Sequence, residues 1–531
     1  MVEVILAGYN VDREALEELV RKGAITTDDL NNFLTPETIS AAYARISRDP
    51  APVTELRKIS RNEVEKARKS NQSIVFKMGH HSVAEHAVLN FDILRISRLA
   101  TEALEAQRLC SYTEKSQRYI TLNNDYVMPD ELIKFEDDFK KAVELQTKAY
   151  KEVYAILKVY VQDNKNLFYL AEDIINLDEE QQARKFEREV REKKMAELLD
   201  EWAKEDARYV MSLATQGQLG FTTNARDLEK FIKYSAAHPL KEVQELGQKL
   251  YKAALPVIPS LLLFLEPNDY LKNSKKRLKE QVSDLLRAND ELVVCAAERE
   301  IRLIHPDKEA DNKLIAALIR SATNESFIKA YMIATRLKPE EKKELVKKTL
   351  EGIQQWDSVP REFEIPELTY EIIMSASCFA QFKRHRMLTL LPGAYEPDNL
   401  GYTIPPSIKQ AGLIFEFMKI MGESEELYRK IKKEMPEVHA SAEPAMPVAS
   451  VEAADYVLTN AHNRRVLVKM NARELYHVSR FREDLHAQWD IRDKATKMVA
   501  LAKEVMPLAM LLVGGKHEFQ KIYNSVYNQQ G

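Results

Sequence analysis

Hydrophobic positions in this 531-residue chain recur mainly at intervals of three and four, with Glu and Lys between them. That spacing is typical of amphipathic helices, and it predicts long helical regions over residues 36–78, 131–162 and 179–202. Two short runs, Ala87–Ile93 and Thr369–Met374, are apolar or β-branched and predict strands. A helix rich in small residues is expected after each strand, beginning near Ser97 and near Ser375.

The chain also repeats itself. Ala-Arg-Tyr-Val precedes Asn-Ala-Arg-Asp-Leu at Asn224, and Ala-Asp-Tyr-Val precedes Asn-Ala-Arg-Glu-Leu at Asn471 with the same spacing. The two segments are offset by 247 residues. Self-similarity on this scale indicates a duplicated domain, so each site residue has a counterpart in the other copy.

The repeat predicts two domains, over residues 1–270 and 290–531, which are joined within 266–291. A new strand is expected at Leu292–Cys295. The first copy is the longer one, and its surplus includes the charged stretch Asp178–Trp202. That stretch predicts an extra solvated helix or a helical hairpin.

Composition narrows the class of protein. Only 14 glycines are present, and the glycine motifs of dinucleotide-binding and P-loop proteins are missing, so arginines and helix N-termini would have to hold a nucleotide. A net charge of −4 with both signs interspersed argues against nucleic-acid binding. The cysteines are isolated, no leader pattern is visible, and the apolar stretch Ala253–Leu265 is too short to span a membrane. We therefore expect a cytoplasmic protein without a membrane partner.

The segment Gly79–His86 contains three histidines and Glu85. Their spacing fits neither HExxH nor HxxEH, so no metal site is predicted. The alternative is a helix N-terminus that is capped by Ser82, with Glu85 completing a capping box.

Three further segments have residues suited to binding an anion. If the chain is extended after Ser111, Glu114, Ser116 and Arg118 point to one face, where a hydroxyl and a guanidinium can clamp a phosphate. An exposed edge strand would carry the same residues. In Gln381–Arg386, the Gln, the first Arg and the His share a face if the segment is helical. Its three cations require either a solvated surface or an anionic ligand.

The third segment is the repeated helix. Asn471 is expected to cap it, Arg473 and His477 lie on one face, and Arg482 lies near its end. Each of these features is common in helices that bind nothing.

In combination, these segments resemble the flavin-dependent thymidylate synthase family, whose pattern includes G-H-x-S-x-x-E-H, Q-x-x-R-H-R, E-x-S-x-R-Y, A-R, N-A-R and R-x-x-x-H-A-Q-W. The first copy resembles it across Gly79–His86, Arg108–Tyr119 and Ala207–Leu228, and the second across Gln381–Arg386 and Asn471–Arg492. The resemblance implies an α+β fold with two homologous domains, each an antiparallel sheet flanked by long helices.

Each copy departs from the family pattern where the other copy keeps it. The Q-x-x-R-H-R helix has lost its first arginine in the first copy, where Ala106 stands, and the E-x-S-x-R clamp has become Pro392–Glu396 in the second. The arginine of A-R is Arg208 in the first copy but Asp455 in the second. The family's uracil-facing arginine is Arg482 in the second copy but Ser235 in the first. In the family, the clamp and the glutamine–arginine helix of one site come from different subunits. Two copies that pair in this way have two possible sites. One site combines the clamp of the first copy with the glutamine–arginine helix of the second and is complete, whereas the reciprocal site lacks the family residues from both copies.

The resemblance implies an enzyme that methylates dUMP to dTMP, with methylenetetrahydrofolate as carbon donor and NADPH as reductant through FAD. The residues it implies for dUMP are Glu114, Ser116, Gln117, Arg118, Arg208, Gln381 and Arg384. Those it implies for FAD are His80, Ser82, Glu114, Arg384, His385, Arg386, Asn471, Arg473 and His477. Arg482 would be the catalytic residue that polarises the uracil. A homodimer of this chain would replace a homotetramer of single domains.

Three rival interpretations remain open at this point. The chain could be a relative that binds nucleotide and flavin without turnover, or a sister enzyme that methylates another pyrimidine nucleotide. It could also be a helical scaffold without a small ligand, against which the unneutralised cations of Arg384–Arg386 argue.

Overall fold

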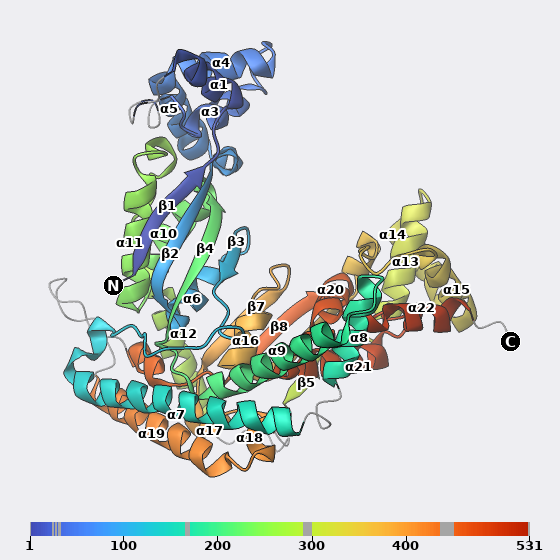
Figure 1. The fold of residues 1–531 in the computed structure, drawn as a ribbon. Coiled ribbons are helices and arrows are strands. Elements are labelled where there is room, and N and C mark those ends of the chain that lie inside the picture. Colours follow the sequence, from blue (N-terminus) through green and yellow to red (C-terminus); the bar gives the residue numbers. More distant parts are fainter. Residues whose placement is uncertain are drawn as a thin grey trace.

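The structure is a computed structural model that describes residues 2–528 except 24–25, 27–28, 30–32, 165–169, 290–299 and 436–450. Two four-stranded antiparallel sheets form its framework, one in each half of the chain (Figure 1). The first sheet has the order β1-β2-β4-β3, with strands Glu3–Tyr9, Val88–Ser97, Gln216–Asn224 and Ser111–Glu114. The second has the equivalent order β5-β6-β8-β7, with strands Ile301–Ile304, Glu367–Ser375, Asn463–Asn471 and Thr389–Tyr395. The expected α+β fold is confirmed.

Helices surround both sheets. The first half contains α1 Arg13–Lys22, α3 Glu37–Arg45, α4 Val53–Asn62, α5 Val64–Asn71, α6 Arg98–Glu105, α7 Glu136–Asp163, α8 Leu170–Gln181, α9 Arg188–Ala207, α10 Ala225–Ser235, α11 Lys241–Ala254 and α12 Asp269–Ala288. The second half contains α13 Ala310–Ala322, α14 Phe327–Arg336, α15 Pro339–Leu350, α16 Ala376–Phe382, α17 Pro397–Leu400, α18 Pro406–Gln410, α19 Ile414–Glu434, α20 Ala472–Arg482, α21 Trp489–Val505 and α22 Phe519–Tyr527. Short turns of other helical type include η1 Gln72–Lys77, η2 His81–His86, η3 Asp130–Phe135, η5 Arg208–Val210, η6 Pro259–Leu261, η7 Arg361–Glu364, η8 Val451–Val457 and η9 Lys516–Glu518. None of the helices that the structure describes is both long and apolar enough to cross a membrane.

The strand-then-helix unit is repeated in both halves as the sequence predicts. In β2, Leu89, Phe91 and Ile93 are buried on one face, because side chains alternate along a strand. The side chain of Ser97 accepts a hydrogen bond from the third residue of α6, and Ser375 caps α16 in the same way. These caps fix where each helix begins relative to its sheet.

Other parts of the chain differ from the prediction. Residues 36–78 form α3, α4, α5 and the π-helical turn η1, because Pro50 and Pro52 interrupt the helical pattern. The Asp178–Trp202 stretch lies in a helical hairpin, α8–α9. It is not wholly solvated, since α9 packs along α7 (Figure 1) and Leu199 of α9 is buried. The expected strand at 292–295 lies outside the described residues, and the two domain boundaries stay a prediction.

The expected helix cap and the expected shared helical face are also wrong. The turn His81–His86 is a 3-10 helix in which no side chain caps the N-terminus, so Ser82 does not act as a cap. Helix α16 ends at Phe382, so Arg384 and His385 lie beyond the helix and not on one face with Gln381.

The two halves are joined around a pseudo-two-fold axis. Ser212 and Thr459, which are equivalent under the 247-residue offset, form a bridge with each other. The backbone amide of Leu213 donates to the carbonyl of Leu458 at 2.8 Å, and that of Asn460 donates to the carbonyl of Met211 at 2.9 Å. The same 247-residue offset relates the donor and the acceptor of one bond to those of the other. Because equivalent groups contact each other reciprocally, the interface has the geometry of a symmetric dimer.

Buried side chains repeat this symmetry. The hydroxyl of Tyr209 donates to Asp490 in the second half at 3.0 Å, and the hydroxyl of Tyr456 donates to Glu242 in the first half at 2.6 Å. Below them, α7 and α19 pack against each other (Figure 1) and share a hydrophobic core. The arrangement makes one continuous molecule from the two copies.

Replacing Tyr456 with phenylalanine is expected to lower the free energy of unfolding by about 1–3 kcal/mol, because the buried Glu242 carboxylate loses one of its hydrogen bonds and, among the described residues, keeps only those from Ser97. Urea-induced unfolding measures the change. Tyr270→Phe, on the exposed helix α12, is the matched control and should leave stability within about 0.5 kcal/mol. Equal behaviour of the two variants would contradict this role for Tyr456.

Candidate active site between the two halves

The phosphate-clamp segment of the first half meets the guanidinium segment of the second. Arg384 forms an ion pair with Glu114 at 2.7 Å, and Arg386 donates to the backbone carbonyl of Cys110. Arg118 pairs with Glu205 of α9 and donates to the carbonyl of His486 in the second half at 3.3 Å. The structure thus brings the two segments into direct contact. The Ser116 hydroxyl accepts from the backbone amide of Arg118 at 3.1 Å and shapes the loop.

Arg208 and Gln117 extend the same site from the first half. The buried Arg208 donates through one amino group to the hydroxyl of Ser377, the second residue of α16, at 2.8 Å. Its Nε is buried without a partner among the described residues. The side-chain amide of Asn460 donates both to Gln117 at 3.1 Å and to the carbonyl of Arg208 at 3.0 Å. Asn460 therefore ties both residues to the second half.

Arg482, His385 and Gln381 form the second half's part of the site. The Nε of Arg482 donates to Nε2 of His385 at 2.9 Å, and one amino group donates to the carbonyl of Gln381 at 3.1 Å. Because Nε2 of His385 accepts, the neutral ring carries its proton on Nδ1. Burial and the Arg482 charge hold the pKa of His385 well below its usual range. Its Nδ1 is buried with no partner in the described part of the chain. The ring of His385 thus offers a donor to a ligand.

Five arginines define what we call the arginine cluster: Arg118, Arg208, Arg384, Arg386 and Arg482. Three of them, Arg208, Arg386 and Arg482, have no carboxylate within ion-pair distance among the described residues.

Burial, with the charges of Arg384 and Arg118, lowers the pKa of Arg482 to about 10. Since Arg482 still carries its charge at neutral pH, the cluster has an excess of positive charge. Such a site favours an anionic ligand.

Two further cationic residues, at positions that the family pattern does not specify, join the halves at this interface. Lys383 pairs with Glu105 of α6 at 2.9 Å, and Arg98 donates to the carbonyl of Ala376 at 3.4 Å. Burial raises the pKa of the Glu114 carboxyl, but Arg98, Lys383 and Arg384 outweigh it and hold that pKa below its usual range. The only signal in the sequence was that Glu105 and Lys383 occupy the same position after Ser97 and Ser375.

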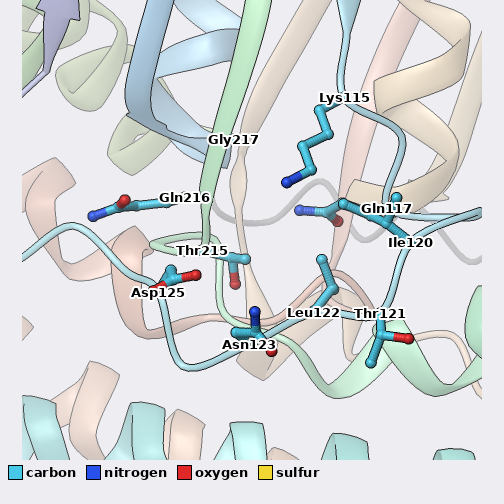
Figure 2. Close-up of a pocket in the computed structure, with 10 residues that line it drawn as sticks. All are labelled: Lys115, Gln117, Ile120, Thr121, Leu122, Asn123, Asp125, Thr215, Gln216 and Gly217. Atoms are coloured by element: carbon cyan, nitrogen blue, oxygen red, sulfur yellow. The ribbon is translucent and has the colours of Figure 1, made fainter.

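Two small cavities lie beside the clamp loop, away from the arginine cluster. The first has a volume of about 50 Å³, and the polar ends of Lys115 and Gln117 point into it (Figure 2). The second, of about 270 Å³, shares Lys115 and Asp125 with it and reaches Arg95. Residues along this loop alternate: Glu114 and Arg118 face the cluster, while Lys115 and Gln117 line the first cavity. Glu114 and Arg118 thus lie apart from Lys115 and Gln117, as the expected alternation requires, although β3 ends at Glu114.

The remaining predicted FAD residues divide into two places. Asn471 caps α20 and Arg473 pairs with Glu364 at 3.0 Å, while the ring of His477 lies 5.5 Å from that of His385. Of these three, only His477 adjoins the arginine cluster, through His385, whereas Asn471 and Arg473 lie at the start of α20. His80 and Ser82 are exposed beside α10 of the first half and have no contact with the cluster in the described structure.

The reciprocal site is filled by side chains. The guanidinium of Arg464 lies 4.7 Å from the ring of Phe379 and 4.4 Å from that of Tyr395, and it pairs with Glu102 at 2.8 Å. Tyr395 also donates to Glu102 at 3.1 Å. Tyr395 belongs to the segment that replaces the clamp, so these contacts engage Arg464 at the reciprocal position.

The helical hairpin that is particular to the first half reaches the site. His486 lies 2.8 Å from Asp484 and 3.3 Å from Asp178 of α8. The hydrogen bond that the His486 ring donates to Asp484 raises the pKa of His486 above its usual 6.5. The charges of Asp484 and Asp178 add to this effect, and burial opposes it. The contact between α8 and the second half therefore depends on protonation of His486.

We expect this contact to be strongest below pH 6.5 and to weaken as the pH rises through the raised pKa of His486. Hydrogen exchange of α8, corrected for intrinsic rates, should show greater protection at about pH 5.5 than at about pH 8.5. Asp178→Asn should remove most of that difference. Equal protection of α8 at the two pH values in the unaltered chain would contradict the prediction.

Two segments of the chain, residues 30–260 and 302–508, match the family described as thymidylate synthase complementing protein. A UPF0159 protein of Chlamydia muridarum is 23% identical over 457 residues, which cover 83% of this chain and 79% of that protein. Another, from Thermoplasma acidophilum, is 22% identical over 493 residues, covering 88% and 93%. Their names state no activity.

A flavin-dependent thymidylate synthase of Clostridium tetani is 28% identical over 239 residues, covering 44% of this chain and 83% of that protein. Among solved structures, a flavin-dependent thymidylate synthase from Helicobacter pylori complexed with FAD and dUMP is 19% identical, with a TM-score of 0.28, and covers 50% of this chain and all of its own. A UMP/dUMP methylase from Streptomyces cacaoi bound with 5-Br dUMP is 17% identical, with a TM-score of 0.31, and covers 49% and 93%. Because the family match extends over most of the chain in two successive segments, the chain belongs to the thymidylate synthase complementing protein family, the flavin-dependent thymidylate synthases, as a tandem duplicated member.

Proposed function

We propose that the chain is a flavin-dependent thymidylate synthase that converts dUMP to dTMP at one composite site. The observation that supports this most is the meeting of Arg118 from the first half with Arg384 and Arg482 from the second. Each half alone supplies only part of the residues that the family pattern requires. The filled reciprocal site around Arg464 supports a single site per chain.

In this proposal the phosphate of dUMP is held by Arg118, Ser116 and Arg208. The free Nε of Arg208 and the uncompensated positive charge of the cluster suit a dianion. Glu114 and Gln117 keep the clamp in place through their contacts with Arg384 and Asn460. Gln381 and Arg384 then approach the nucleotide from the second half.

Arg482 takes the catalytic role. Its guanidinium is held in place by His385 and the carbonyl of Gln381, and it carries a full charge in a partly buried position. As the uracil ring is activated, negative charge develops on its polar edge, and a fixed cation there stabilises the transition state more than the ground state. Ser116 serves binding only, because no histidine beside it can act as its base.

The donor set also fits FAD, because the buried Nδ1 of His385 lacks a partner and Arg386 has no carboxylate in the described structure. We assign FAD to Glu114, Arg384, His385, Arg386, Asn471, Arg473 and His477, together with His80 and Ser82. When bound, FAD would supply hydride, with NADPH as its reductant and methylenetetrahydrofolate as carbon donor. His80 and Ser82 can take part only if another surface brings them to the site, and the predicted homodimer would provide one.

Release of tritium from dUMP labelled at C5 tests the activity. The purified chain with FAD, NADPH and methylenetetrahydrofolate should release the label, and omission of the folate should stop the release. Labelled UMP in place of dUMP tests the sister-enzyme alternative. A chain that binds FAD and dUMP but releases no tritium would be a binding protein, and the proposal would be wrong.

A further inference from the structure

Glu105 and Lys383 are counterparts of each other. Each lies eight residues after the serine that caps its helix, Ser97 in the first half and Ser375 in the second. In the structure their side chains meet at 2.9 Å, and only 2% and 3% of their respective surfaces are exposed. Two equivalent positions therefore carry opposite charges and form a buried ion pair across the interface.

Equivalent groups can touch only where the pseudo-two-fold axis passes between them. The same axis passes between Ser212 and Thr459, which form a bridge. It also passes near Arg98, which donates to the carbonyl of its own counterpart, Ala376. The Glu105–Lys383 pair is thus a contact on the axis and not an incidental neighbour.

The two charges that meet at a position on the axis depend on which halves have paired. If two first halves paired, the glutamate would face a second copy of itself, and if two second halves paired, two lysines would meet. Both arrangements bring two like charges together in a buried place, which is unfavourable. Only a first half with a second half brings opposite charges together. A device that penalises the wrong partner is a common source of specificity between similar surfaces.

We propose that the Glu105–Lys383 pair makes each first half accept a second half and reject another first half. The recognised partner is the opposite half, whether of the same chain or of a second copy. Such selection matters for a duplicated chain, because its two halves retain surfaces that are similar enough to pair in the wrong combination. This inference does not depend on the proposed enzyme activity.

Charge reversals in the full chain test the proposal. Glu105→Lys gives a chain with lysine at both positions, and Lys383→Glu gives one with glutamate at both. Each should melt on the order of 10 °C below the unaltered chain, because like charges then meet in a buried place. The matched control is Lys430→Glu, which breaks an exposed ion pair with Asp138 across the same interface and should change the melting temperature by no more than about 2 °C.

Mixing the two reversal variants is the decisive step. After unfolding and refolding together, each lysine-bearing first half can pair with a glutamate-bearing second half of the other chain. The mixture should melt well above either variant alone, and a tagged Glu105→Lys chain should retain more of an untagged Lys383→Glu chain than of an untagged Glu105→Lys chain on a column. Refolding each variant with itself should give no such gain.

The proposal is overturned if the single reversals melt like the control, or if the mixture gains no stability over the separate variants. If a single reversal variant precipitates on its own, the yield of soluble chain is measured in place of the melting temperature. The proposal is then overturned if the mixture gives no higher yield than the separate variants.

Discussion

Replacing Arg482 with alanine is expected to lower the rate of dTMP formation by about 10²–10³-fold, the usual consequence of removing one fixed donor from a developing negative charge. The guanidinium has no carboxylate partner in the described structure, so its charge is not neutralised by an ion pair there. His385 and the backbone around it should remain in place, because α16 and α20 are held by their own caps.

The matched control is Arg480→Ala on the same helix. Arg480 donates to the carbonyl of Asp357 and lies over the ring of Phe519, away from the arginine cluster. Turnover in that variant should stay within about threefold of the unaltered chain. Steady-state kinetics should place the Arg482→Ala loss mainly in kcat, with a smaller change in KM for dUMP. A loss confined to KM would show that Arg482 only binds the nucleotide.

Replacing Arg118 with alanine should weaken dUMP binding by at least about 100-fold, which corresponds to about 3 kcal/mol of charge-assisted hydrogen bonding. Arg118 is fixed by Glu205 and the carbonyl of His486, so its guanidinium is positioned before the phosphate arrives. That preorganisation makes its contribution larger than that of a mobile surface arginine.

Glu396→Ala is the control for Arg118→Ala, because Glu396 occupies the equivalent position in the second half. Its carboxylate accepts only from the side chain of Asn399 among the described residues, at 3.1 Å. Calorimetric titration should show that the Glu396→Ala variant binds dUMP with the affinity of the unaltered chain. If both variants lost affinity alike, the clamp would not be particular to the first half.

Local sequence signals predicted the repeated elements well. The serines at 97 and 375 and the asparagines at 224 and 471 each cap the helix that follows their strand. The sequence also predicted that the clamp and the guanidinium segment would meet, because the first copy keeps only the clamp and the second copy keeps only the guanidinium segment. This prediction is confirmed at Glu114 and Arg384.

Contacts between distant segments could not be predicted from local patterns. Glu105 and Lys383 become partners only because the two halves pack around a shared axis, and neither occupies a position that the family pattern specifies. The end of α16 before Arg384 and the contact of Asp178 with His486 depend on tertiary packing in the same way. Spacing along one helix or strand carries no information about such contacts.

The number of dUMP molecules bound per chain tests the central claim that one working site is built from both halves. Titration of the FAD-loaded protein should saturate at one dUMP per 61.2 kDa chain, and Arg118→Ala or Arg384→Ala alone should each weaken that binding by at least about 100-fold. Saturation at two dUMP molecules per chain, or binding that survives both substitutions, would contradict a single composite site.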